Sequence, residues 1–341
     1  MQPIYSIIAP VYNEKDNLPE LYRRVKQVMD QTGEAWELII IDDGSVDGST
    51  QAIRDLAQQD PKVRPVIFAR NFGHQLAVTA GLDYSRGQAV VIIDSDLQDP
   101  PEVILDLIAK WKEGFEVVYA VREEREGESW FKEFTASLFY RLINKITNVP
   151  IPLDTGDFRL MDRKVVEVLN KMREHHRFIR GMSVWVGFRQ TGVKYRRAAR
   201  FAGSTKYPFR KMVRFASDAI TGFSFLPLQL ATYMGFISAG ISILAIPIVI
   251  AIRLWGAHEP LLGQATTLIV VLFLGGVQLI SLGILGEYIG RLYEESKGRP
   301  LYVVLEEPVG LEEPVGLEEP VGLEEPSEGK DIQEIENKGV R

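Results

Sequence analysis

The sequence predicts an α/β protein with a doubly wound parallel sheet, followed by interfacial amphipathic helices and two membrane-spanning helices. Two patterns support this prediction. Up to about Asn148, runs rich in Val and Ile that end at Gly, Asp or Ser alternate with helical segments, as in parallel α/β sheets. Later, the stretches 219–252 and 260–286 contain no charged residue. Each is longer than the about 20 apolar residues that cross a bilayer core as a helix.

The elements of the first part follow one another in a regular order. Each expected strand is a short apolar run that stops at a turn, and the expected helices lie between such runs. Strands are expected at 5–12, 36–45, 63–70 and 89–96, with helices at 18–31 and 49–59. In a sheet of this kind the ligand crevice lies at the carboxyl ends of the strands.

Two further segments have the apolar periodicity of amphipathic helices. For 130–148, packing on the sheet and lying at the membrane interface are equally supported alternatives. The segment 208–222 carries Arg210, Lys211 and Arg214 and runs directly into the first uncharged stretch. This position and charge favour a helix at the membrane interface over a core helix.

The two uncharged stretches are predicted to form a transmembrane hairpin over 223–290; the alternative is a pair of buried core helices. Basic residues flank the hairpin at its outer ends, whereas the connecting loop carries only Arg253. By the positive-inside rule, the first domain and both termini face the cytoplasm from an inner or plasma membrane. Glycines in the spans permit close helix packing, so we expect a homo-oligomer. They are Gly235, Gly240, Gly275 and Gly276.

Composition and the two chain ends limit the remaining chemistry. The sequence has no cysteine and four histidines, so any metal should be a hard cation held by carboxylates.

The N-terminal residues lack the basic region of a signal peptide. The unit LEEPVG begins at Leu305 and recurs, and its Pro and Glu content predicts a disordered acidic tail. The expected parts are the first domain 1–207, the interfacial helix 208–222, the hairpin 223–290, a juxtamembrane segment 291–304 and the tail 305–341.

The strongest chemical signal is a pair of carboxylates, Asp94 and Asp96, directly after an apolar run. Two carboxylates at i and i+2 suit Mg²⁺ or Mn²⁺, which keeps open positions for substrate phosphates. A solvated Asp-rich turn is the alternative. The loops Pro10–Glu14 and Asp42–Ser45 are expected at the same sheet edge, where they could bind a base or ribose. The second of them also has an obvious role as a helix cap.

Together these motifs resemble the family-2 glycosyltransferases with the GT-A fold. The resemblance rests on Pro-Val-Tyr-Asn-Glu at 10–14, Asp-Asp-Gly-Ser at 42–45 and Asp-Ser-Asp-Leu-Gln-Asp-Pro-Pro at 94–101. Arg-Asn-Phe-Gly-His at 70–74 and the two spans resemble the polyprenyl-phosphate branch, with its dolichol-phosphate mannose synthases and bactoprenol glucosyltransferases. The resemblance covers about residues 4–300. It implies a mostly parallel GT-A sheet and inverting transfer of a hexose from a nucleotide sugar to a lipid phosphate.

The resemblance also implies roles for individual residues. The donor nucleotide would be bound by Pro10, Tyr12, Glu14, Asp43 and Arg70. Asp94 and Asp96 would bind the metal and act in catalysis, and Gln98 would also lie at the metal. The acceptor phosphate and the diphosphate would be bound by Arg122, Arg200, Ser204, Lys206 and Tyr207. Attraction of the basic run 194–210 to anionic headgroups is the alternative for part of this last set.

Asp157, in the cluster 154–161, would by the same resemblance lie near the donor sugar as a catalytic residue often described as a base. A phosphate monoester has a second pKa near 6, so most of the acceptor is already dianionic at neutral pH. We therefore expect Asp157 mainly to orient the donor sugar or the acceptor, and only secondarily to share a proton. A structural turn is the alternative for this cluster. His175 and His176 are expected at an exposed helix end, without a metal.

The substrates with the best support from the resemblance are UDP-glucose and undecaprenyl phosphate, and no nucleic-acid partner is expected. GDP-mannose and a UDP-aminoarabinose type of donor are alternatives. A processive polysaccharide synthase would usually carry more spans and a Gln-x-x-Arg-Trp motif, and neither is visible. A non-catalytic membrane scaffold would have no need for Asp94 and Asp96.

Overall fold

The computed structural model describes residues 2–123, 155–197, 224–254 and 263–308. Several of the expected features lie outside these ranges. They are the amphipathic segments 130–148 and 208–222, most of the repeat tail, and the residues Arg200, Ser204, Lys206 and Tyr207.

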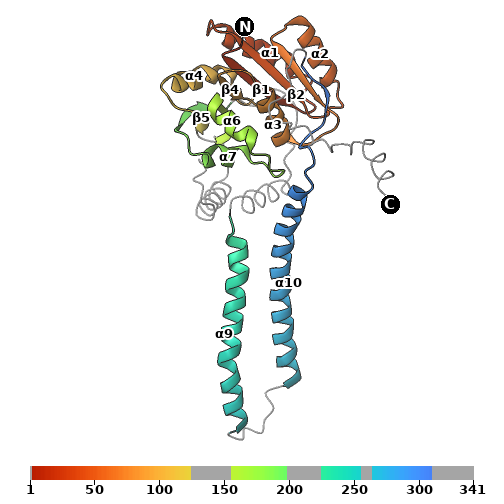
Figure 1. Cartoon of the computed structure of the whole chain (residues 1–341), viewed down its shortest axis with the longest axis vertical. Coiled ribbons are helices and arrows are strands. Elements are labelled where there is room, and N and C mark those ends of the chain that lie inside the picture. The colour runs from red at the N-terminus through yellow and green to blue at the C-terminus, as the bar shows by residue number, and fades with distance from the viewer. Residues whose placement is uncertain (1, 124–154, 198–223, 255–262, 309–341) are drawn as a thin grey trace, which may run out of the picture. The chain divides into compact units, whose positions relative to one another are not determined.

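The central sheet is mixed, with mostly parallel strands around its middle (Figure 1). Its order is β7-β5-β6-β4-β1-β2-β3-β8. The pairs β1–β2, β1–β4, β2–β3 and β5–β7 are parallel, whereas β4–β6, β5–β6 and β3–β8 are antiparallel. The strands are β1 (Tyr5–Val11), β2 (Trp36–Asp42), β3 (Val63–Phe68), β4 (Ala89–Ile92), β5 (Val117–Glu123), β6 (Thr155–Asp162), β7 (Gln190–Arg196) and β8 (Val304–Glu306).

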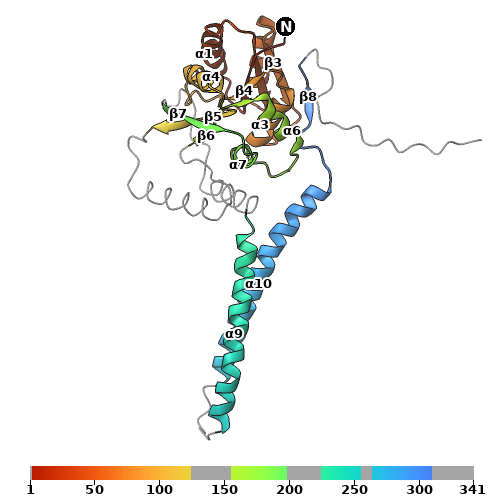
Figure 2. The same cartoon turned by 60° about the vertical axis from the view of Figure 1, so that its left-hand side comes forward.

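Helices cover both faces of this sheet, as the alternation of elements predicted (Figures 1 and 2). The apolar sides of α1, α2 and α4 pack into one cluster with alternate residues of the strands, while α3 contacts β1 and β2 and also packs on α6. The helices are α1 (Leu18–Asp30), α2 (Ser49–Gln59), α3 (His74–Tyr84), α4 (Ile104–Lys112), preceded by the short helix η1 (Pro101–Val103), α6 (Arg163–Lys171) and α7 (Ile179–Trp185). The predicted fold class is confirmed.

The helix α3 approaches the sheet closely at Gly81. A Cβ at this position would lie 2.2 Å from Cγ2 of Ile8 and 3.0 Å from Cδ1 of Ile41. A side chain therefore cannot be added without moving α3 away from the sheet. Because α3 begins at His74, this packing also sets where the first residues of α3 lie.

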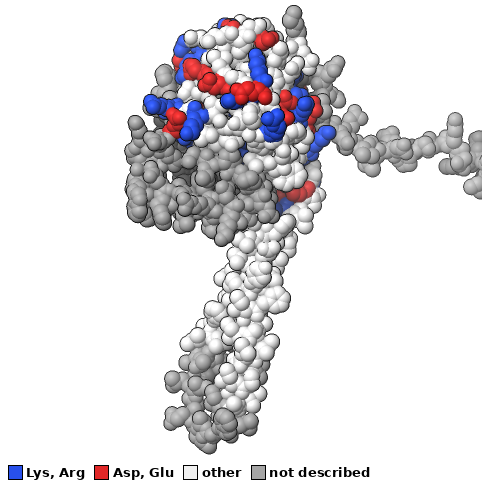
Figure 3. All heavy atoms as spheres, turned by 90° about the vertical axis from the view of Figure 1, so that its left-hand side faces the viewer, with Lys and Arg blue, Asp and Glu red and all other residues white. Residues whose placement is uncertain are grey.

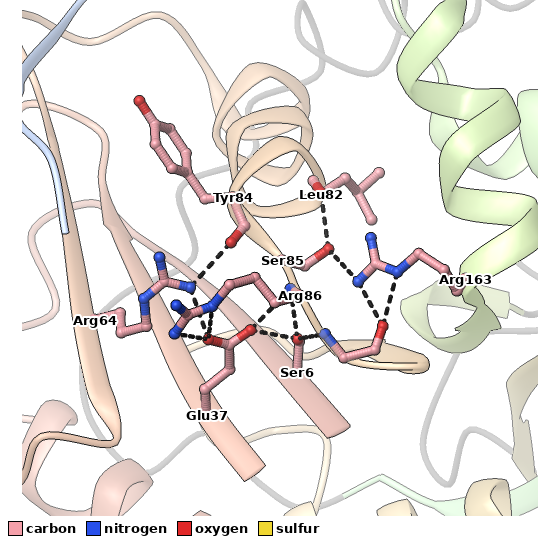
Figure 4. A network of polar contacts seen from close by, with 9 residues as sticks. Ser6, Glu37, Arg64, Leu82, Tyr84, Ser85, Arg86 and Arg163 are labelled. Atoms are coloured by element: carbon pink, nitrogen blue, oxygen red, sulfur yellow. Dashed lines mark hydrogen bonds and ion pairs between the residues drawn. The ribbon is translucent and has the colours of Figure 1, made fainter. Parts of the chain in front are cut away.

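A buried polar network joins the amino-terminal ends of the strands (Figure 4). Ser6 and Glu37 are partners across β1 and β2, and the Ser6 hydroxyl donates to Glu37 Oε1 at 2.6 Å. Glu37 Oε2 accepts from Arg64 at 2.7 Å and from Arg86 at 3.1 Å. The Ser6 oxygen also accepts from the Gly87 amide at 2.7 Å. The network thus ties β1, β2, β3 and the start of β4 together at the sheet edge away from the strands' carboxyl ends.

Two long apolar helices follow the α/β domain, α9 (Leu226–Leu254) and α10 (Gly263–Ser296). Within them, Leu226–Ala245 and Ile269–Ser296 are long and apolar enough to cross a membrane, and neither is buried inside the protein. Figure 3 shows these helices as uncharged over most of the face drawn, in contrast to the mixed charges of the α/β domain. Their exposure argues against the alternative of buried core helices.

The chain after α10 returns to the α/β domain. Tyr302 stacks on Phe68 with ring centroids 5.1 Å apart, and its hydroxyl donates to Asp83 at 2.7 Å. The strand β8 then pairs with β3, and Glu307 accepts from the Tyr84 hydroxyl at 2.9 Å. The expected start of the tail at 305 therefore falls inside a strand.

The expectation of an exposed helix end for His175 and His176 is wrong, because α6 already ends at Lys171. His175 Nδ1 lies 3.0 Å from Glu295, and His176 Nε2 lies 2.7 Å from Glu294, near the end of α10. These contacts and the return strand attach the end of α10 to the α/β domain.

Candidate active site

The loops that follow β1 and β2 lie side by side at the carboxyl edge of the sheet. Val11 and Asp42, which end the two strands, are partners in the register. Beyond them, the Asn13 amide donates to Ser45 Oγ at 2.9 Å, and the Asn13 side chain accepts from the Val46 amide at 2.8 Å. The structure thus brings the two predicted donor loops together. Pro10 is buried in β1, whereas Tyr12 is 41% exposed and able to face a ligand.

Asp43 holds the loop that connects β3 to α3. Its carboxylate is nearly inaccessible to solvent and accepts from the amides of Phe72 at 2.6 Å and Gly73 at 3.0 Å. Burial raises the pKa of Asp43, although these two amides oppose the shift. Gly44 makes the close contact possible, because it has φ +71° and a Cβ there would lie 2.6 Å from the backbone of Arg70.

Arg70, the remaining predicted nucleotide residue, is exposed on this loop, and its guanidinium lies 4.0 Å from the Phe72 ring centroid. Glu14 is half-buried, and its Oε2 accepts from the Asn17 side chain at 2.5 Å. Both residues stand at the edge that the predicted donor loops share. The geometry is therefore compatible with a nucleotide at this edge.

The predicted metal residues form a turn directly after β4. Leu97 has φ +59° and is buried, so its side chain points inward while Asp96 and Gln98 stand on either side of it. Asp96 Oδ1 accepts from the Gln98 amide at 3.1 Å. Asp94 is partly exposed, at 28% of its side chain. The turn predicted from the sequence is therefore present, with both carboxylates near the carboxyl end of β4.

The electrostatics of this turn fit a divalent cation. Partial burial raises the pKa of Asp94 to about 6, and the nearby carboxylates of Asp99, Asp157 and Asp96 act in the same direction, while His74 opposes them. A dication would relieve this accumulation of negative charge, and carboxylate oxygens are the ligands that Mg²⁺ and Mn²⁺ prefer. Among the described residues, no three Asp, Glu, His or Cys side chains are grouped so that they could hold a metal ion. Mg²⁺ is often held by only one or two carboxylates, with substrate phosphates supplying further ligands.

Asp157 is the centre of a buried ionic cluster. Its Oδ1 accepts from Arg180 Nε at 2.8 Å, and its Oδ2 accepts from Gln75 Nε2 at 3.0 Å and lies 3.1 Å from His74 Nε2. Burial opposes ionisation, but the charge of Arg180 and the hydrogen bond from His74 hold the pKa of Asp157 well below its usual value. Such a carboxylate is a weak base and a well-fixed anchor.

His74 connects this cluster to the turn after β4. Its Nε2 is 3.7 Å from Asp94 Oδ1, in addition to its contact with Asp157. Burial alone would lower the pKa of His74, but the two carboxylates outweigh it and raise the pKa to about 9. The two carboxylates therefore favour the protonated imidazole, and His74 joins the Asp157 cluster to the predicted metal residues.

Arg122 lies at the end of β5 close to β6. Its Nε donates to the Tyr195 hydroxyl at 3.3 Å, and the Tyr195 hydroxyl donates in turn to Asp99, which is fully buried. A Cβ on Gly156 would lie 2.8 Å from Arg122 Nη2, so the guanidinium packs against the residue before Asp157. The structure thus places one predicted phosphate-binding arginine beside the Asp157 cluster.

Several residues of this site were not predicted. His74, Gln75 and Arg180 surround Asp157, while Asp99 and Tyr195 hold Arg122. The segment 155–162 is a buried strand, so the alternative of a structural turn is wrong there. Asp99 belongs to the acidic motif at 94–101, and His74 ends the motif at 70–74. Each of these two residues therefore had a signal in the sequence. Gln75, Arg180 and Tyr195 had none.

Comparison with known proteins identifies the family of the first domain and several relatives of the whole chain. Residues 6–169 match the glycosyl transferase family 2 domain. The chain is 51% identical to the uncharacterized glycosyltransferase YkcC of Bacillus subtilis, over 88% of this chain and 93% of that protein. An uncharacterized glycosyltransferase of Synechocystis is 47% identical, over 88% and 94%. A bactoprenol glucosyl transferase of Shigella phage SfV is 44% identical, over 89% and 98%.

Proposed function

This chain belongs to glycosyl transferase family 2, and we propose that it transfers a hexose from a nucleotide sugar to the phosphate of a polyprenyl lipid at a membrane. The main support is the similarity to bactoprenol glucosyl transferase over nearly the whole of both proteins. The same chain joins a sheet edge rich in carboxylates to two helices apolar enough to cross a membrane. A sugar acceptor that stays in the bilayer explains why both are present.

The proposed reaction is a direct displacement at the anomeric carbon. An oxygen of the lipid phosphate attacks this carbon from the side opposite the nucleoside diphosphate. The new carbon–oxygen bond forms as the bond to the diphosphate breaks, so the configuration inverts and the diphosphate leaves with the bonding electrons. Asp94, Asp96 and Gln98 would hold Mg²⁺ or Mn²⁺, and the bound dication would stabilise the negative charge of the leaving diphosphate.

The chain's own residues have proposed roles in binding and orientation. We assign five residues to the donor nucleotide: Pro10, Tyr12, Glu14, Asp43 and Arg70. Asp43 would act indirectly, because its carboxylate holds the loop at 70–73. Arg122 is assigned to the lipid phosphate or the diphosphate, together with the residues Arg200, Ser204, Lys206 and Tyr207. Arg suits this task because its guanidinium can bind phosphate through two parallel hydrogen bonds.

The proposed substrates are UDP-glucose and undecaprenyl phosphate, used at the cytoplasmic face by a homo-oligomer. A panel of nucleotide sugars with undecaprenyl phosphate in vesicles tests this assignment. We expect the fastest lipid-linked product from UDP-glucose, and loss of product when EDTA removes the divalent cation. Faster transfer from GDP-mannose or a UDP-aminoarabinose donor would replace the donor assignment. Failure of every donor to label the lipid phosphate would contradict the proposed function.

Asp157→Asn is expected to lower kcat by about 100-fold at every pH between 6 and 9, because a misplaced anchor costs orientation. The lowered pKa of Asp157 makes it a poor proton acceptor, and the acceptor dianion needs no base over most of this range. The pH–rate profile is the measurement. Arg180→Gln, which removes an ionic partner of Asp157, should give a similarly flat loss. A loss confined to low pH would instead support proton abstraction by Asp157.

A further inference from the structure

One large aromatic side chain of the α/β domain stands out by its exposure. Trp185 ends α7 and is 61% exposed, although Ile179 and Met182 of the same helix are buried. Tryptophan buries a large apolar area when it finds a partner, so leaving it in water is costly. Val184, Val186 and Phe188 next to it are only half-buried. The end of α7 thus presents a small apolar surface.

The contacts of the preceding loop limit how far this surface can lie from the end of α10. His175 and His176 bind Glu295 and Glu294. Glu294 lies seven residues beyond Glu287, the first charge after the apolar stretch, which corresponds to about 10 Å of helix. From His176, the chain can place Trp185 at most about 20 Å away, because most of the connection is helical. Trp185 is therefore within reach of the level at which α10 would leave a bilayer.

Exposed basic side chains follow Trp185 in the sequence. Arg189 directly follows this segment and is exposed, and Lys194 and Arg196 are exposed on the edge strand β7. Tryptophan is enriched at the membrane–water interface, where its ring lies at the level of the headgroups. Each basic residue near an anionic surface adds about 1 kcal/mol of attraction. Aromatic and basic groups together are the composition that an anionic lipid surface would bind.

We propose that Trp185 inserts into the headgroup layer of an anionic membrane beside α10, with Arg189, Lys194 and Arg196 facing the lipid headgroups. The contact is additional to the two spans, and it rests on the proposed function only in requiring that α9 and α10 cross a membrane. It has a consequence for the site, because α7 also carries Arg180, which binds Asp157. A lipid contact at Trp185, the last residue of α7, would keep Arg180, near the first residue of α7, at a constant height above the bilayer.

The chain has no cysteine, so single spin labels report on this contact without background. Labels are placed at Trp185→Cys, at Val46→Cys and at Ile280→Cys, in nanodiscs containing phosphatidylglycerol. Val46 is 87% exposed in a loop of the α/β domain, and Ile280 is 57% exposed in α10. The measurement is the collision rate with oxygen relative to that with a water-soluble nickel chelate. We expect the ratio at 185 to lie above the ratio at 46 and below that at 280, and to fall when neutral lipid replaces phosphatidylglycerol.

A ratio at 185 equal to that at 46, with a high ratio at 280, would overturn the lipid contact while leaving the spans and the proposed function intact. Strong dipolar broadening between labels at 185 would also overturn it, because a second copy of the chain would then cover Trp185. Low ratios at both 185 and 280 would contradict the membrane crossing itself. Transfer by the unlabelled chain is assayed separately, so the failure of either proposal can be recognised.

Discussion

Replacing Asp96 by Ala is expected to lower sugar transfer by about three orders of magnitude. Metal ions contribute several kcal/mol to stabilising charge in a transition state, and each 1.36 kcal/mol corresponds to a factor of about ten in rate. Asp96 lies in the turn after β4, and its carboxylate is one of those that raise the pKa of Asp94. Without its carboxylate, the remaining ligands would bind the dication too weakly to stabilise the leaving diphosphate.

The fold should survive this change. Removing the Asp96 carboxylate relieves its repulsion of Asp94 but also removes the oxygen that accepts from the Gln98 amide. These effects oppose each other, so we expect the thermal midpoint of Asp96→Ala to lie close to that of the parent chain. Asp106→Ala provides a matched control, because Asp106 is an exposed carboxylate on α4, in the same domain. It should retain full transfer.

Binding of Mn²⁺ in the presence of UDP supplies a second measurement that does not depend on turnover. Mn²⁺ affinity should fall in Asp96→Ala and stay unchanged in Asp106→Ala. If Asp96→Ala transfers sugar at the parental rate, the metal assignment is wrong. The same holds if EDTA leaves transfer by the parent chain unchanged.

The central strands were predictable because their pattern is local. Each apolar run at 5–12, 36–45, 63–70 and 89–96 contains the observed strand and ends at the polar turn that follows it. The same turns carry Tyr12, Asp43, Asp94 and Asp96. Because ligands bind at the carboxyl ends of parallel strands, this part of the candidate site could be predicted from the strands alone. Burial on both faces of a parallel sheet makes such runs nearly continuous in Val and Ile.

The Asp157 cluster could not be derived in this way. Its members come from α3, β6 and α7 and are separated by up to 106 positions, from His74 to Arg180. No periodicity relates them. The strand β6 is also atypical, because it buries the charged residues Asp157 and Arg159, and a charged segment after a Gly is more typical of a turn. Ion pairs with residues that are distant in the sequence offset the cost of removing these charges from water.

The residues at the expected start of the tail, Leu305–Glu307, are ordered for a related reason. Repeated Glu and Pro predict disorder, but Glu306 and Glu307 find Arg54 and Tyr84 on the α/β domain. Tyr302 secures the preceding residues on Phe68 and Asp83. Contacts with distant elements therefore order these residues, although their composition predicts disorder. The sequence gives no indication of these contacts.

Glu37→Gln is expected to destabilise the α/β domain by about 3–5 kcal/mol, because it removes one partner of a buried ion pair. Glu37 is 2% exposed and Arg64 is 5% exposed. Within the described part of the chain, Nε and Nη2 of Arg64 have no hydrogen-bond partner, so Glu37 supplies the compensating charge. Burial raises the pKa of Glu37, but Ser6 and Arg64 outweigh it, and the net pKa lies below the ordinary value. This contribution to stability is present at neutral pH and is lost as the pH falls through the acidic range.

The measurement is the thermal unfolding of the full chain in detergent, where about 3–5 kcal/mol corresponds to a decrease of roughly 6–20 °C for a domain of this size. Glu34→Gln is the matched control, because Glu34 is exposed just before β2; it should leave the midpoint unchanged. The double variant Glu37→Met with Arg64→Met should recover much of the lost stability, since an apolar pair leaves no buried charge alone. A midpoint of Glu37→Gln equal to that of Glu34→Gln would show that the network adds nothing to stability. Failure of the double variant to recover would mean that Glu37 acts mainly through Ser6 and Arg86, which also bind it.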